Sequence, residues 1–150
     1  MKLAEALNER ADIQKRIEQL RNRLNINAKV QEGEKPNEEP ADLLKELDGC
    51  CKRLEELISR INATNSAAVI DGVTISSLIA KRDVLRLKIS VIRDFLDNAG
   101  INIRRMGGSE IKILPTVKVS AKQKELDELS RQLRELDTKL QGANWTIDLL

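Results

Sequence analysis

The sequence predicts an all-α protein of four long antiparallel helices, a helical bundle or coiled coil, with a small β-hairpin arm between the third and fourth helices. Leucine and isoleucine recur at steps of three and four over four long segments, the period of a helix with one buried face. Charged residues make up 33% of the chain and its only aromatic residues are Phe95 and Trp145, so the core must be aliphatic. We expect a single helical coiled-coil domain over residues 1–150.

The first helix is expected over residues 2–28. Its apolar seam is interrupted by Arg10 and Asn27, polar residues of the kind that fix the register of coiled coils. Residues 31–40, which hold a glycine and two prolines among several glutamates, cannot continue a helix and predict an exposed acidic connection.

The second helix is expected over residues 41–63. Pro40 suits its first turn, and Asp42 places a negative charge near its positive end. The seam is assigned to six residues, with three more on the adjoining stripe: Leu44, Leu47, Cys51, Leu54, Ile58 and Ile61, then Leu43, Cys50 and Leu57.

An Asp71-Gly72 pair between β-branched residues then predicts a loop with a small extended turn. Thr74 or Ser76 can cap a third helix over residues 75–99, which Gly100 stops. Its seam is Leu78, Arg82, Leu85, Ile89, Ile92, Leu96 and Ala99, widened by Val84, Leu87, Val91 and Phe95.

Residues 101–114 alternate apolar and polar on both sides of a Gly-Gly turn, which predicts the β-hairpin arm. Ser120 and Gln123 form a capping box for a fourth helix over residues 121–141, ended by Gly142. Its seam is Leu126, Leu129, Leu133, Leu136 and Leu140.

Four helices of similar length suit an up-down-up-down bundle, but also two hairpins that pair with those of another subunit. Helices two and three carry a wider apolar stripe than a two-helix contact needs. We therefore expect a homo-oligomer, with the hairpin arm and the acidic connection available to an unknown protein partner.

The composition argues against several classes of protein. No histidine is present to act as a general base or metal ligand, and no catalytic, metal or cofactor motif appears, so we expect no enzyme, no metal and no cofactor. The basic residues of the third helix alternate with aspartates and lack stacking aromatics, so nucleic acid is an unfavoured partner. No apolar run is long enough for an integral membrane segment, and no signal peptide is evident.

The cysteines favour a reducing compartment. Cys50 and Cys51 are adjacent, which suits neither a disulfide framework nor a metal site, so we expect a cytoplasmic protein with Cys51 packed in the core. Trp145 is expected to anchor the terminal segment or, if exposed, to mark an interface.

One polar constellation could bind a ligand. Asn62, Thr64 and Asn65 end helix two, while Arg82 and Asp83 lie early in helix three. If the two helices are antiparallel neighbours, these side chains form either a hydrogen-bonded plug or a small-ligand pocket.

The chain also resembles a family of small bacterial helical proteins, some of which carry the label septicolysin. The matching blocks fall in order along the chain: KLAEAL (2–7), ERADIQKRI (9–17), AKVQEGE (28–34), INATN (61–65), RDVL (82–85), SEIK (109–112) and GANWT (142–146). The label implies a membrane-active cytolysin. The leading hypothesis from the residues is instead a non-enzymatic structural or interaction protein that self-associates; a membrane-active protein and a small-molecule binding protein are the alternatives.

Overall fold

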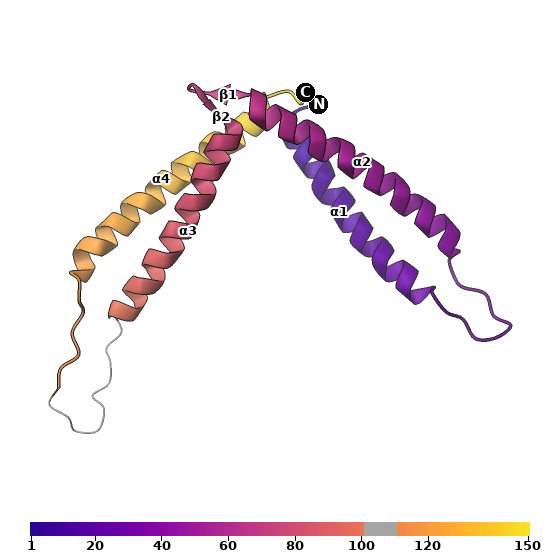
Figure 1. The fold of residues 1–150 in the computed structure, drawn as a ribbon, viewed down its shortest axis with the longest axis horizontal. Helices are drawn as coiled ribbons and strands as arrows, with labels where there is room; N and C mark the ends of the chain where they lie inside the picture. Colours follow the sequence, from indigo (N-terminus) through magenta and orange to yellow (C-terminus); the bar gives the residue numbers. More distant parts are fainter. Residues whose placement is uncertain (101–110) are drawn as a thin grey trace. The chain divides into compact units, whose positions relative to one another are not determined.

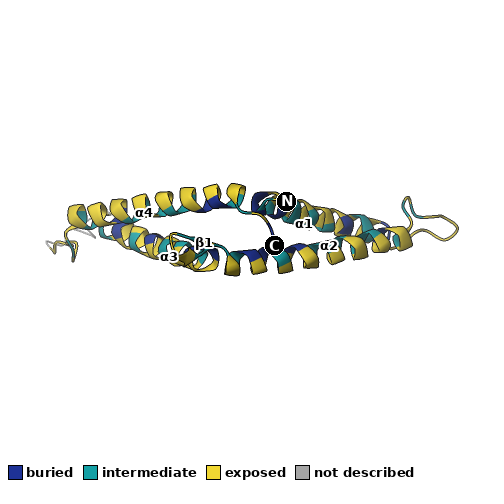
Figure 2. Cartoon of the chain, turned by 90° about the horizontal axis from the view of Figure 1, so that it is seen from above, coloured by how far each residue is buried: buried dark blue, intermediate teal, exposed yellow. Residues whose placement is uncertain are grey.

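The computed structural model describes residues 1–100 and 111–150 and confirms the all-α class (Figure 1). Its elements are α1 (Leu3–Ile26), α2 (Pro40–Ala67), β1 (Val69–Ile70), β2 (Val73–Thr74), α3 (Ile75–Gly100) and α4 (Val119–Thr146). They form two compact units, one of residues 1–74 with 142–150 and one of residues 75–141. The single domain over residues 1–150 stays a prediction. Figure 2 shows buried and half-buried residues alternating with exposed ones along every helix.

In the first unit, α1 and α2 pack against each other as a helical hairpin. The buried residues of α2 are Leu43, Leu57, Ile61 and Thr64, which lie at the three-and-four spacing of one helix face. Leu44, Cys51 and Ile58, which the sequence assigned to the seam, are exposed. The predicted seam of α2 was therefore wrong at these three positions, but right at Ile61, which is buried, and at Leu47 and Leu54, which are half-buried. The stripe through Leu43 and Leu57 is the one that meets α1.

The connection from α1 to α2 is held by polar side chains. Asn27 is buried at the end of α1; its Nδ2 donates to the Arg23 carbonyl at 2.8 Å, and its Oδ1 accepts from the Glu38 backbone N–H at 3.1 Å. Arg23 Nε also donates to Glu38 Oε2 at 3.0 Å, and this hydrogen bond lowers the pKa of Glu38. Asn27 thus anchors the acidic connection and does not interrupt a helix–helix seam.

The predicted small turn between helices two and three is present as a two-stranded hairpin. Val69 pairs with Thr74 and Ile70 with Val73 in antiparallel register. Asp71 and Gly72 have φ of 50° and 80°, the left-handed conformation that a two-residue hairpin turn requires. The Asp-Gly pair provides it at low cost, because glycine lacks the Cβ that disfavours positive φ.

In the second unit, α3 and α4 pack through the predicted seams. Ile89, Leu96 and Leu126 form its buried core. Four half-buried side chains pack around them: Leu85, Ile92, Leu129 and Leu133. The leucine repeat of α4 therefore meets the Leu85–Leu96 face of α3, as its spacing predicts.

Several helix ends differ from the prediction. Helix α2 continues past residue 63 to Ala67, and α4 begins at Val119 and runs through Gly142 to Thr146. Because the Lys118 carbonyl accepts from the N–H groups of residues 121 and 122, Lys118 begins the first turn of α4, and the predicted capping box at Ser120 was wrong. The predicted β-hairpin arm falls mainly on residues 101–110, outside the described residues, and residues 111–114 belong to no strand.

The two ends of the described chain are joined in the first unit, where Figure 1 marks them side by side. The Leu3 N–H donates to the Ile147 carbonyl and the Leu149 N–H to the Met1 carbonyl, each at 2.9 Å. Lys2 Nζ lies 2.8 Å from Asp148 Oδ1. Leu149 is buried, so we call residues 147–150 and their contacts the terminal clasp.

Candidate functional site

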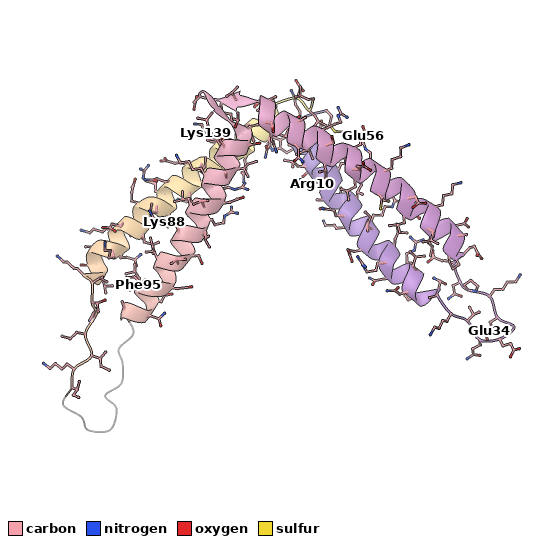
Figure 3. All side chains as sticks on the ribbon, in the orientation of Figure 1. Arg10, Glu34, Glu56, Lys88, Phe95 and Lys139 are labelled. Atoms are coloured by element: carbon pink, nitrogen blue, oxygen red, sulfur yellow. The ribbon has the colours of Figure 1, made fainter. Side chains whose placement is uncertain are left out.

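An exposed apolar face on α3 is the most distinctive surface of the described residues. Val84 and Leu87 are each 66% exposed, Val91 is 61% exposed and Phe95 is 46% exposed. Steps of three, four and four place these four side chains in one row, which we call the α3 stripe. Figure 3 shows Phe95 near the far end of α3.

The prediction that these four residues widen the buried seam of the third helix was wrong, because all four are exposed. The α3 stripe is separate from the face of α3 that packs on α4. The packed residues Leu85, Ile89 and Leu96 lie well over 90° around the helix from Leu87 and Val91. Helix α3 is therefore apolar on two faces, although α4 covers one of them. A second apolar face that is exposed in this way commonly marks an interaction surface.

A smaller apolar row lies on α2. Leu44 is 50% exposed and Ile58 is 38% exposed, with the exposed thiol of Cys51 midway between them. A shallow hollow of about 410 Å³ includes Cys51, Leu54 and Ile58 in its lining. The prediction that Cys51 packs in the core was wrong, since that position faces away from α1.

A groove of about 730 Å³ lies between α1 and α2. Its charged side chains pair across the two helices: Arg53 Nε lies 2.7 Å from Glu9 Oε1, and Arg16 Nε lies 3.0 Å from Glu46 Oε1. The hydrogen bond from Arg53 lowers the pKa of Glu9 below its ordinary value. These ion pairs join the two helices, and Asp12 is a further carboxylate in the groove lining.

The predicted polar constellation is divided between the two units. Asn62 is exposed and Asn65 half-buried on α2 in the first unit. In the second unit, Arg82 Nη2 lies 3.1 Å from Asp83 Oδ1, and Arg82 Nε lies 4.0 Å from Asp137 of α4. A ligand site at Asn62, Asn65, Arg82 and Asp83 stays a prediction.

Thr64, from the same constellation, is hydrogen-bonded to residues outside that constellation. It is 1% exposed, its Oγ1 donates to the Arg60 carbonyl at 2.8 Å, and it accepts from the Leu150 N–H at 2.9 Å. Arg60 Nε donates to the Leu150 carbonyl at 2.7 Å. The sequence pointed to Thr64 but gave no sign that the last residues of the chain are its partner. Trp145 is 61% exposed, so Leu149, not Trp145, anchors the terminal segment.

The described residues also bear on metal sites and on membrane-spanning helices. Over residues 1–100 and 111–150, no group of three metal-ligating side chains could hold an ion. Within the same residues, no helix is both long and apolar enough to cross a bilayer.

A family model described as "Family of unknown function (DUF6847)" matches residues 10–149. The chain belongs to this family. A solved structure, described as a functionally unknown conserved protein from Corynebacterium diphtheriae, is similar to this DUF6847 chain, with 36% sequence identity and a TM-score of 0.92. The similarity covers 100% of this chain and 99% of the other. No curated protein matches.

The comparisons support part of the resemblance found in the sequence. Membership of the DUF6847 family agrees with an uncharacterised family of helical proteins. Neither the family nor the Corynebacterium protein carries the label septicolysin, so that label is not supported.

Proposed function

We propose that the protein is a non-enzymatic interaction module that self-associates through the α3 stripe. The observation that carries the proposal is the exposure of Val84, Leu87, Val91 and Phe95, at 46–66%, on a helix whose other apolar face already packs on α4. A second copy is the occupant that this surface suits, because a row of apolar residues on one helix is self-complementary across a twofold axis.

The size of the stripe fits a reversible association. Full burial of one such side chain contributes about 1.5–3 kcal/mol, and these are already partly buried, so a gain of about 1 kcal/mol each is expected. Two copies bring eight side chains together, and lost translational and rotational freedom offsets several kcal/mol of that gain. The dimer should therefore form and dissociate over an accessible concentration range.

Two further features support the proposal. Four of the charged side chains in the groove between α1 and α2 form ion pairs across the two helices, Arg16 with Glu46 and Arg53 with Glu9, which suits a scaffold. The exposed thiol of Cys51 suits a reducing compartment, and we propose a cytoplasmic location. Recovery of the untagged protein mainly from a periplasmic or extracellular fraction would contradict that location.

The test is the mass of the protein in solution, measured by light scattering over a range of concentrations. The wild-type chain should be a dimer at high concentration. Leu87→Glu should be monomeric, because two buried carboxylates without partners cost roughly 3 kcal/mol or more, about a hundredfold in Kd.

Leu44→Glu is the matched control, since it makes the same change at a half-exposed leucine of α2. It should keep the dimer. A wild-type chain that stays monomeric at high concentration would overturn the proposal, and dissociation by Leu44→Glu alone would move the interface to α2.

A further inference from the structure

Charges of opposite sign line the two edges of the α3 stripe. At about 100° per residue, Lys81 and Lys88 fall on one side of the stripe, whereas Asp83 and Asp94 fall on the other. All four residues are exposed, and Figure 3 shows Lys88 part-way along α3. Asp83 Oδ1 also lies 3.1 Å from Arg82 Nη2, which offsets part of its charge. The stripe therefore has a basic edge, Lys81 and Lys88, and an acidic edge, Asp83 and Asp94.

Two copies of such a surface can meet across a twofold axis in two ways. If the axis runs along the helices, the copies are parallel, and the basic edge of each faces the acidic edge of the other. If the axis is perpendicular to the helices, the copies are antiparallel, and each edge faces its own counterpart. Parallel coiled-coil dimers use the same crossed arrangement of flanking charges to select their partners.

Axial positions make the difference specific. In an antiparallel pair centred on the stripe, Lys88 would lie within about 5 Å, along the helix axis, of Lys88 of the second copy. Asp83 would lie within about 3 Å, along the same axis, of Asp94 of the second copy. In a parallel pair, Lys81 instead lies within about 3 Å, along the helix axis, of Asp83 of the second copy. Like charges placed opposite one another, chiefly the two copies of Lys88 because Asp83 already pairs with Arg82, disfavour the antiparallel pair.

We propose that two copies of the chain pair through the α3 stripe in parallel, with the basic edge of each copy against the acidic edge of the other. This inference rests on the proposed self-association and adds the orientation of the partner. Equivalent residues of the stripe then face each other along its whole length.

Disulfide cross-linking tests the orientation. In a Cys50→Ser, Cys51→Ser background, Val84→Cys and Phe95→Cys are made separately and oxidised at a concentration where light scattering shows a dimer. In a parallel pair each variant alone should convert mostly to covalent dimer. In an antiparallel pair, equivalent residues at either position are offset by about 16 Å, well beyond the roughly 7 Å that a disulfide can span between Cα atoms.

The matched control is Thr138→Cys, on the exposed face of α4 away from the stripe, which should stay uncross-linked. Cross-linking only in an equimolar mixture of the position 84 and position 95 variants would overturn the parallel arrangement and leave self-association standing. A dimer that cross-links at neither position would show that another face is used and would also overturn the inference. A monomer in the background variant and in the wild type would instead refute the proposed function itself.

Discussion

Adjacent leucines at the start of α2 offer a direct test of which stripe of that helix packs on α1. Leu43 is 3% exposed and Leu44 is 50% exposed. Leu43→Ala and Leu44→Ala delete the same side-chain atoms at adjacent positions of the helix. Leucine and alanine both favour helix, so the change in helix propensity is nearly the same in the two variants. The difference between them reports burial.

The expected magnitudes follow from those exposures. Leu43→Ala leaves a cavity against α1 and should lower the free energy of unfolding by about 3 kcal/mol. Leu44→Ala removes side-chain atoms that are half in water and leaves no enclosed cavity, so the expected loss is roughly 0.5–1 kcal/mol.

The assay is urea denaturation followed by far-ultraviolet circular dichroism at a low protein concentration, analysed for the transition that includes α2. Both variants should keep the denaturant slope of the wild type, because the surface exposed on unfolding is unchanged. Equal losses, or a larger loss for Leu44→Ala, would show that the seam runs through Leu44 and would refute this account of the α1–α2 hairpin.

Two other substitutions test local chemistry. Thr64→Val keeps the shape of a fully buried side chain but removes its hydrogen bonds to the Arg60 carbonyl and the Leu150 N–H. Urea denaturation should therefore show a free energy of unfolding that is lower by about 1–2 kcal/mol. An unchanged free energy of unfolding would contradict a role for the hydroxyl. On α4, hydrogen bonding by Arg131 lowers the pKa of Glu128 from its ordinary value of 4.5 to about 2. The ionised Glu128 side chain therefore stabilises the fold fully above pH 4.5, and this stabilisation is lost as the pH falls toward about 2. The thermal midpoint of the wild type should therefore fall more on acidification than that of Glu128→Gln, and parallel curves for the two proteins would rule out this contribution.

The sequence predicted the number and approximate bounds of the helices because the apolar period extends over each of them. It also placed the α3 and α4 seams correctly, since on each of these helices the apolar stripe that forms the seam is longer than any other apolar stripe. On α2, however, two adjacent stripes are apolar over the same length. Only the position of α1 selects the one through Leu43 and Leu57, and no property of α2 alone contains that information.

Helix ends and site residues were less predictable because they depend on contacts that leave no periodic pattern in the sequence. Gly142 usually stops a helix, but here Thr146 Oγ1 donates to the Gly142 carbonyl, and the helix continues toward the terminal clasp. The clasp itself depends on backbone pairing between residues far apart in sequence, which leaves no periodic signal. By contrast, the excess apolar surface of α3 is visible in the sequence as a second row of large residues, and this row became the candidate interaction surface.

The discontinuous first unit has a consequence for synthesis on the ribosome. Residues 75–141 are contiguous, so the α3–α4 hairpin has its whole sequence available before translation ends. The first unit includes residues 142–150, and its last contacts join Met1 and Leu3 to Leu149 and Ile147. The part of the chain made first therefore becomes complete last, and until residues 142–150 have left the ribosome the nascent α1–α2 hairpin must persist without the backbone hydrogen bonds of the terminal clasp.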